Sequence, residues 1–367
     1  MKIINTLSVL FFLLFAVACT SESDTIMNDI DKEVETTTEK VAVFDISFMS
    51  NVIDTKASVS EDDTESKDNE ARVAENAISN CFIAALDAEN NVVSSFVYEG
   101  KEDFTQNGNI ATINNHMIIK VPANTPPTLR FYAVANLYIT EQYTSSIKGE
   151  LLGCKTLSAI QEVVFNDEAP TVLVKVGCSE AYSNYKTGTS INSDTYTEVT
   201  IPVTQRSAAI ELAEFKVVDS NKDEIKEVVV KSLQLLNMKE KAKVGGEYED
   251  SNKNKPQESC RYHLEDDCVN ESGYHFSSFK DIRFYAYDNT SDAKTSLKID
   301  YTVNGVFYSR TYTIKTPATN GYTESVVGGK LYQLYVTVGA VSEDIQFKVN
   351  DWIPNKIDLG EIEGTLK

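Results

Sequence analysis

Apolar and polar residues alternate along many short stretches of this chain, and turn residues separate the stretches. Alternation with a period of two is typical of β-strands that bury one face. The clearest case is a hairpin in which residues 297–303 and 308–314 alternate around Asn304-Gly305, a pair suited to the positive φ angles of a type I′ turn. Further strand patterns lie at residues 78–86, 92–98, 116–121, 129–137, 171–176, 199–204, 208–212, 282–286, 332–338 and 345–349.

Helix is predicted only at residues 157–164, although the alanines around residues 78–86 give helix and strand competing support there. The turn residues that follow, and the apolar stretch 92–98, favour a strand and a hairpin. Many short strands with almost no helix predict an all-β protein built from β-sandwiches.

The chain of 367 residues is long for a single hydrophobic core, so we expect two domains. Residues 179–193 are poor in large aliphatic side chains, and we place the boundary there. The predicted domains are two tandem β-sandwiches, residues 40–190 and residues 191–367. Residues 239–280 are charged and irregular, and they predict a long loop or insertion.

Residues 40–56 contain a lone strand-like run at the start of the first domain. Its apolar face consists of alternate residues, Ala42, Phe44, Ile46 and Phe48. The acidic stretch 19–39 precedes it, and the charged stretch 57–76 follows it. Charged stretches of small residues predict a flexible tether before the strand and a solvated loop after it, in which a protease can bind the extended backbone.

The first 18 residues have the pattern of an export signal. Lys2 supplies a positive charge, an apolar run follows, and small residues lead to Ala18-Cys19. This order resembles a bacterial lipobox, in which the Cys19 thiol receives a diacylglycerol and the peptide is cut between Ala18 and Cys19. Two or three acyl chains would hold such a precursor on a membrane. The alternative is an ordinary secretory signal in which Cys19 is incidental.

The charge and the cysteines narrow the function further. A formal net charge of −21 argues against binding to nucleic acid or to anionic lipid headgroups. Five cysteines follow the lipobox, and an odd number cannot all pair within an exported chain. Cys260 and Cys268 are close enough in sequence to form one local disulfide. Cys81 and Cys178 lie in apolar strand patterns and are predicted to be buried thiols.

The sequence offers no specific catalytic or metal site. Cys260, His263, Cys268 and His275 form the one cluster of metal-capable side chains, but their spacing matches no specific zinc pattern. A local disulfide or a solvated loop explains the cluster better. Acidic pairs arise by chance among 55 Asp and Glu residues, and no phosphate-binding or nucleophile motif is present. We therefore expect no enzyme, no metal and no cofactor apart from the covalent lipid on Cys19.

Several separated motifs together resemble one family, the Bacteroidales fimbrillins, which are subunits of type V pili. The first two are the lipobox at Cys19 and Thr55-Lys56-Ala57, which is similar to the Thr-Arg-Ala often found at the fimbrillin maturation site. The others follow in the family's order and are Glu75-x-x-Ile78 with AALDAENNVV, Val121-Pro122, FYAVANL, residues 203–210 (VTQRSAAI), YQLYVTV, Val349-Asn350-Asp351-Trp352 and Ile357-Asp358-Leu359.

The resemblance implies two transthyretin-like, Greek-key β-sandwiches and a role in adhesion to a host or bacterial target. It implies a lipoprotein precursor at the outer membrane, from which a trypsin-like protease removes the first strand. The C-terminal strand of another pilus subunit would then fill the emptied groove by strand addition. The donor residues would be Ile345, Phe347, Val349, Trp352, Ile357 and Leu359. This head-to-tail contact does not close on itself, so it builds a fimbrium at the cell surface.

The sequence departs from the family pattern at the cleavage site. The matching motif carries Lys56 before Ala57, whereas an arginine-specific protease would need Arg72, before Val73. We favour Lys56–Ala57 from its position, and Arg72–Val73 is the alternative. A chain cut at neither bond would resemble an anchor subunit that stays lipidated.

Two further hypotheses concern the role of the protein. The apolar residues that continue beyond Trp352 favour a stalk subunit, which needs a donor segment, over a tip subunit. The competing hypothesis is an outer-membrane surface lipoprotein that binds glycans through its β-sandwiches. That function predicts exposed aromatic side chains, for which one tryptophan is poor provision.

Overall fold

Strands dominate the computed structural model of this chain, which confirms the all-β prediction. The structure describes residues 39–50, 73–137, 141–166, 173–188, 196–218, 228–239, 241–248, 261–263, 282–339 and 343–351. These residues all belong to one compact unit, Thr38–Lys367, and the division into two separate domains stays a prediction. No helix within these ranges is long and apolar enough to cross a membrane.

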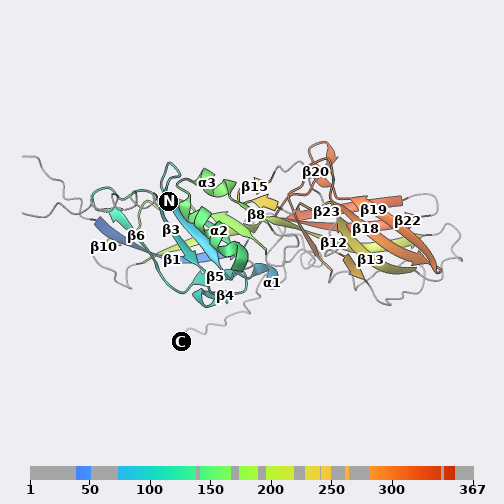
Figure 1. Ribbon diagram of the computed structural model, residues 1–367, viewed down its shortest axis with the longest axis horizontal. Helices are drawn as coiled ribbons and strands as arrows, with labels where there is room; N and C mark the ends of the chain where they lie inside the picture. The colour runs from blue at the N-terminus through green and yellow to red at the C-terminus, as the bar shows by residue number, and fades with distance from the viewer. Residues whose placement is uncertain are drawn as a thin grey trace, which may run out of the picture. The chain divides into compact units, whose positions relative to one another are not determined.

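The first sheet has β1 near its middle (Figure 1). Its main path runs in the order β3 (Val92–Tyr98), β2 (Cys81–Leu86), β7 (Arg130–Ala135), β9 (Lys175–Cys178), β11 (Thr197–Gln205), β1 (Glu39–Ser50), β5 (Ile110–Ile113) and β4 (Phe104–Asn107). Two further strands, β6 (Met117–Pro122) and β10 (Thr187–Gly188), also pair with β1.

Strand β2 is buried on both faces because its six residues, CFIAAL, are all apolar. One face of β2 packs in the same apolar core as β1. The other face packs against the two longer helices of the described chain. Figure 1 shows these helices, α2 (Glu141–Gly153) and α3 (Leu157–Glu162), against this sheet. Two shorter helical segments are α1 (Val73–Asn76) and the 3-10 turn η2 (Lys101–Asp103). The predicted helix at 157–164 is confirmed, whereas α2, which has only a weak apolar stripe, is missed by the sequence analysis.

Strand β11 belongs to the first sheet, although the sequence analysis places it in the second domain. Residues 44–50 of β1 pair with residues 197–203 in parallel, and β9 pairs with the other edge of β11. The chain therefore changes sheet at Arg206, between β11 and β12 (Ser207–Val218). Periodicity in the sequence identifies the buried face of a strand, but it does not identify the strand's neighbours.

The second half of the described chain forms two four-stranded sheets around one apolar core. One sheet has the order β17 (Phe284–Tyr287), β12 (Ser207–Val218), β22 (Lys330–Gly339) and β23 (Glu343–Asp351). The other has the order β16 (Arg261–His263), β13 (Val228–Leu236), β18 (Ser296–Val303) and β19 (Val306–Thr313). A separate short hairpin joins β20 (Thr316–Ala318) to β21 (Gly321–Thr323).

The predicted hairpin of the second half is confirmed. Asn304 and Gly305 join β18 to β19, with φ angles of 49° and 78°. Strand β13 is missed by the sequence analysis, although it pairs with β18 over most of its length.

The predicted irregular loop 239–280 begins with short strands. Strand β14 (Lys241–Lys243) pairs with β15 (Gly246–Glu247) and with β8 (Val164–Asn166), which comes from the first half of the chain. Ala242 and Val244 are buried in the same cluster as α3. The start of this loop is therefore part of the framework, and it ties the later chain to the earlier one.

Gly177 of β9 allows a close approach between β9 and β11. A Cβ at this position would overlap the carbonyl oxygen of Pro202. We expect Gly177→Ala to lower the free energy of unfolding by about 1–3 kcal/mol, because backbone atoms must move apart. Denaturant unfolding would measure this. The control is Gly149→Ala in α2, where a Cβ meets open space, and we expect a gain of up to about 1 kcal/mol there. Equal effects of the two substitutions would contradict the close approach.

Lys175 of β9 is fully buried and gives stability a pH dependence. Burial lowers the pKa of Lys175 to about 7, although the carboxylate of Glu75 raises it. In the unfolded chain its pKa is about 10.4. Between pH 7 and 10 the unfolded state therefore binds more protons, and this residue makes stability rise with pH. We expect Lys175→Met to flatten the slope of the free energy of unfolding against pH in that window, and an unchanged slope would contradict the lowered pKa.

Candidate functional site: the slot of the first strand

Strand β1 has hydrogen-bonded neighbours on both of its edges. On one edge it pairs with β10 and then, in parallel, with β11. On the other edge it pairs with β6 and then with β5, both antiparallel. Every residue of Glu39–Ser50 has a partner on at least one side. The strand therefore occupies a slot whose two walls come from segments that lie far from it in the sequence.

The apolar face of β1 fills the core of the first sheet. Its predicted members are confirmed as buried, each with no exposed surface, and they are Ala42, Phe44, Ile46 and Phe48. The three larger side chains together contribute on the order of 5–9 kcal/mol of apolar burial. This burial adds to the backbone pairing that holds the strand in place.

The slot offers aromatic contacts to two of these side chains. The ring of Phe44 lies 4.8 Å from that of Phe131 in β7 and 5.3 Å from that of Tyr185. The ring of Phe48 lies 6.4 Å from that of Phe104 in β4. Sequence patterns do not predict these contacts of Phe131, Tyr185 and Phe104, because a strand pattern does not reveal which strand it faces.

The opposite face of β1 buries Val43 and otherwise makes a few weak polar contacts. Asp45 lies 3.9 Å from Nδ1 of His116, and both side chains are about one-third exposed. The His116 ring stacks on Tyr196 at 5.3 Å, and the Ser47 hydroxyl donates to the carbonyl of Val199 at 3.4 Å. Exposed contacts of this kind contribute little to stability. Backbone pairing and apolar pockets therefore dominate the binding of β1.

The predicted donor segment begins as a strand of its own sheet. Within β23, Ile345 pairs with Val336, Phe347 with Leu334, and Val349 with Tyr332, all on β22. Val349 also packs against the core of the second half. In this structure β23 is an edge strand with β22 as its partner along the sheet path. The other predicted donor residues, Trp352, Ile357 and Leu359, lie outside the described residues.

Several predicted sites cannot be placed on this framework. The lipidation site Cys19 with Ala18, the cleavage residues Lys56, Ala57 and Arg72, and the pair Cys260 and Cys268 all lie outside the described residues. Val73, on the far side of the alternative cleavage bond, is the first residue of α1.

The cysteines that the structure describes are free thiols. Cys81 is buried, as predicted, and burial raises the pKa of its thiol well above the usual range, with a smaller contribution from Asp103. Cys178 is only half-buried, and Cys154 is nearly buried. Burial also raises the pKa of both thiols. Thiols with raised pKa values are poor nucleophiles and poor metal ligands at neutral pH.

The described ranges contain no group of three or more His, Cys, Asp or Glu side chains arranged to hold a metal ion. His116 contacts the carboxylate of Asp45 and stacks on the ring of Tyr196.

No protein-family model and no curated protein sequence matches the chain. Among solved structures, a Parabacteroides distasonis protein provisionally described as a cell adhesion protein aligns with 87% of this chain and 99% of its own, at 17% identity and a TM-score of 0.57. A second Parabacteroides distasonis protein with the same description aligns with 86% of this chain and 100% of its own, at 13% identity and a TM-score of 0.50. A fimbrilin from Porphyromonas gingivalis aligns with 85% of this chain and 99% of its own, at 14% identity and a TM-score of 0.49. The chain therefore has the fold of the two Parabacteroides distasonis proteins.

Proposed function

We propose that this protein is a structural subunit of a cell-surface pilus that serves adhesion and belongs to the stalk. The observation that carries the proposal is the place of β1, a strand near the chain start that lies in the middle of a sheet between distant segments. The shared fold with proteins provisionally described as cell adhesion proteins supports the same role. The function is mechanical, and it requires no catalytic group.

The proposed maturation begins with a lipid-anchored precursor at the outer membrane, held through Cys19. A trypsin-like protease cuts after Lys56, or alternatively after Arg72, and β1 is then free to leave. Its departure exposes two rows of backbone groups and the pockets of Phe44, Ile46 and Phe48. Such a slot binds another strand with the same alternation of apolar residues.

In the proposed assembly, the C-terminal segment of another subunit fills this slot. Its apolar residues are Ile345, Phe347, Val349, Trp352, Ile357 and Leu359. Ile345, Phe347 and Val349 lie within β23, which pairs with β22 of the same chain. Strand β23 must therefore leave its own sheet before it can enter the slot of another subunit. Residues after Asp351 can donate without breaking any of those pairs. The exchange therefore becomes easier as more of the contact comes from residues 352–367.

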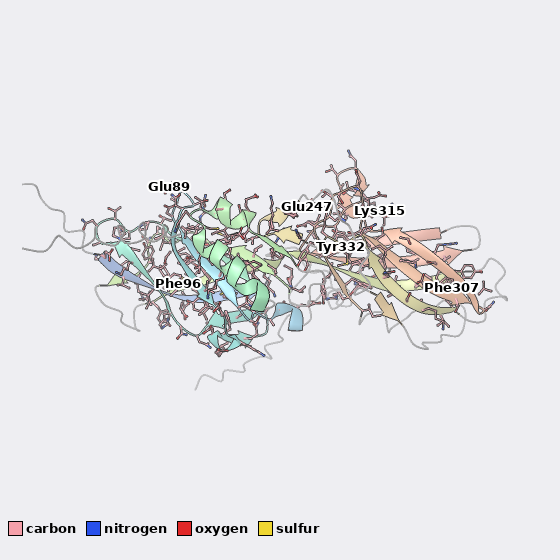
Figure 2. All side chains as sticks on the ribbon, in the orientation of Figure 1. Glu89, Phe96, Glu247, Phe307, Lys315 and Tyr332 are labelled. Atoms are coloured by element: carbon pink, nitrogen blue, oxygen red, sulfur yellow. The ribbon has the colours of Figure 1, made fainter. Side chains whose placement is uncertain are left out.

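The glycan-binding alternative has one observation in its favour. Phe307 on the β18–β19 hairpin is 62% exposed, and Tyr322 on β21 is 58% exposed (Figure 2 labels Phe307). Exposed aromatic rings can stack on sugars. A chain that stays monomeric after loss of β1 and binds a polysaccharide would support this alternative.

Cleavage between β1 and α1 is expected to convert a monomer into oligomers. The experiment treats recombinant residues 20–367 briefly with a trypsin-like protease and follows size by light scattering and electrophoresis in mild denaturant. N-terminal sequencing of the retained chain chooses between Ala57 and Val73. The control carries Gln at Lys56, Lys67 and Arg72, the basic residues of the segment between β1 and α1. It should keep β1 and stay monomeric. Oligomers from the uncut control, or none from the cut wild type, would contradict the proposal.

The two partners of one aromatic contact should behave differently before and after assembly. Phe44 leaves with β1, whereas Phe131 stays with the slot. We expect Phe44→Ala to lower the free energy of unfolding of the uncut precursor by about 3–5 kcal/mol. The same substitution should leave the unfolding of the cleaved oligomer unchanged. Phe131→Ala should destabilise both forms. A cleaved oligomer that is sensitive to Phe44→Ala would mean that β1 is retained.

A further inference from the structure

A buried polar cluster holds the helix α1 that follows the segment with both candidate cleavage bonds. Glu75 of α1 is 4% exposed, and Nη1 of Arg283 donates to its two carboxylate oxygens at 3.2 and 3.0 Å. The Tyr285 hydroxyl donates to the same carboxylate at 2.6 Å. Nε of Arg283 donates to Glu211 at 3.1 Å, and Gln333 donates to Glu211 at 2.7 Å. We name these five residues the Glu75 cluster.

The Glu75 cluster is charged and nearly free of solvent. Burial opposes the charge of Arg283, but Glu211 and then Glu75 raise the pKa of its guanidinium. The arginine therefore stays charged between the two carboxylates. A buried charge that loses its partner is strongly destabilised. If Glu75 leaves the cluster, Arg283 keeps Glu211 as its ion partner but loses its two hydrogen bonds to Glu75. The Tyr285 hydroxyl also loses this acceptor.

The backbone after Glu75 is held by side chains of the first sheet. The Gln205 amide donates to the carbonyl of Glu75 at 3.0 Å. The carbonyl of Ala77 accepts from Lys175 at 3.1 Å and from Asn136 at 2.7 Å. These donors come from β11, from β9 and from the residue after β7, so three separate segments hold the carbonyl groups of Glu75 and Ala77.

Asn136 also holds the next residues, as a bracket around the chain. The side-chain oxygen of Asn136 accepts from the backbone N–H of Ser79 at 2.9 Å. The backbone N–H of Asn136 donates to the Asn80 carbonyl at 2.9 Å. Asn136 has a φ of 59°, a conformation that Asn adopts more readily than most residues. The Ile78 amide donates to the side chain of Gln106 at 3.3 Å. Side chains therefore hold Glu75, Ala77, Ile78 and Ser79, and a backbone bond holds Asn80.

We propose that residues 75–80 form an anchor that holds the retained chain end while β1 is removed and replaced. The inference rests on the proposed function. It follows from position, since the anchor stands between the segment that carries both candidate cleavage bonds and strand β2. Strand β2 does not pair with β1 and is held on both edges by β3 and β7. The residues before β2 are held by groups that do not belong to β1, so they keep their place when β1 leaves.

The anchor also selects between the two candidate cleavage bonds. A protease binds residues on both sides of the cleaved bond in extended form. After the Arg72–Val73 bond the chain enters α1 at once, and Glu75 is gripped two residues further on. Cleavage there requires α1 to unwind and the Glu75 cluster to open. The Lys56–Ala57 bond lies 19 residues before Glu75 in the sequence and has no such requirement. The anchor therefore disfavours cleavage at Arg72–Val73, and Lys56–Ala57 stays the preferred bond.

The test places one recognition sequence of a site-specific protease at either of two positions in the full precursor. One position is residues 57–63, and the other ends directly before Val73. We expect the first to be cut at least about tenfold faster than the second, since opening the cluster breaks a buried ion pair. Glu75→Gln should speed the second cut at least several-fold and leave the first unchanged. Tyr285→Phe removes one hydrogen bond to Glu75 and should speed the second cut by a smaller factor. This variant tests the anchor even if Glu75→Gln folds poorly.

Hydrogen exchange supplies the second readout and the control. After release of β1, amides of residues 75–80 should stay protected in the wild type and lose protection in Glu75→Gln. Glu89→Gln, an exposed carboxylate in the β2–β3 turn (Figure 2), should match the wild type in both readouts. Unchanged exchange in β18 would show that the fold is intact. Equal cutting at the two positions, or no effect of either cluster variant, would overturn the anchor. Absence of oligomers would overturn the proposed function alone, since neither readout needs assembly.

Discussion

The first sheet depends on β1, a strand whose hydrogen-bonded partners all lie far from it in the sequence. β1 pairs with β11 on one edge, about 150 residues later in the chain, and with β5 and β6 on the other. Taking β1 out of the middle of the sheet leaves two unpaired edges and an empty apolar core. Either condition is unfavourable in water, so the slot must be filled by β1 or by an equivalent strand.

The sequence predicted β1 well because its signal is local. Alternation around Phe44 and Phe48 identifies the buried face, and the hairpin at Asn304-Gly305 is likewise defined by adjacent residues. The place of β11 was not predictable in this way. Its alternation marks a buried face, but its parallel partner lies far away in the sequence and leaves no periodic trace. The same holds for Phe131, whose burial is evident in an apolar stretch but whose contact with Phe44 is not.

The Glu75 cluster was hidden from sequence reasoning for a related reason. Glu75, Glu211 and Arg283 are three charged residues in a chain with 55 acidic side chains, and their types alone suggest a solvated surface. Only the fold brings them together and excludes water from them. Burial turns ordinary charges into a specific contact, because each buried carboxylate then needs the one guanidinium that lies between them.

Two kinds of binding therefore meet at the start of the retained chain, and they differ in what can replace them. β1 is held by backbone pairing and apolar pockets, which any strand of similar alternation satisfies. Residues 75–80 are held by Arg283, Lys175 and Asn136, whose geometry suits only that stretch of chain. In the proposed assembly, the generic contacts are those that are exchanged, and the specific contacts are those that are kept. A boundary between the two at α1 would let β1 leave without loosening residues 75–80.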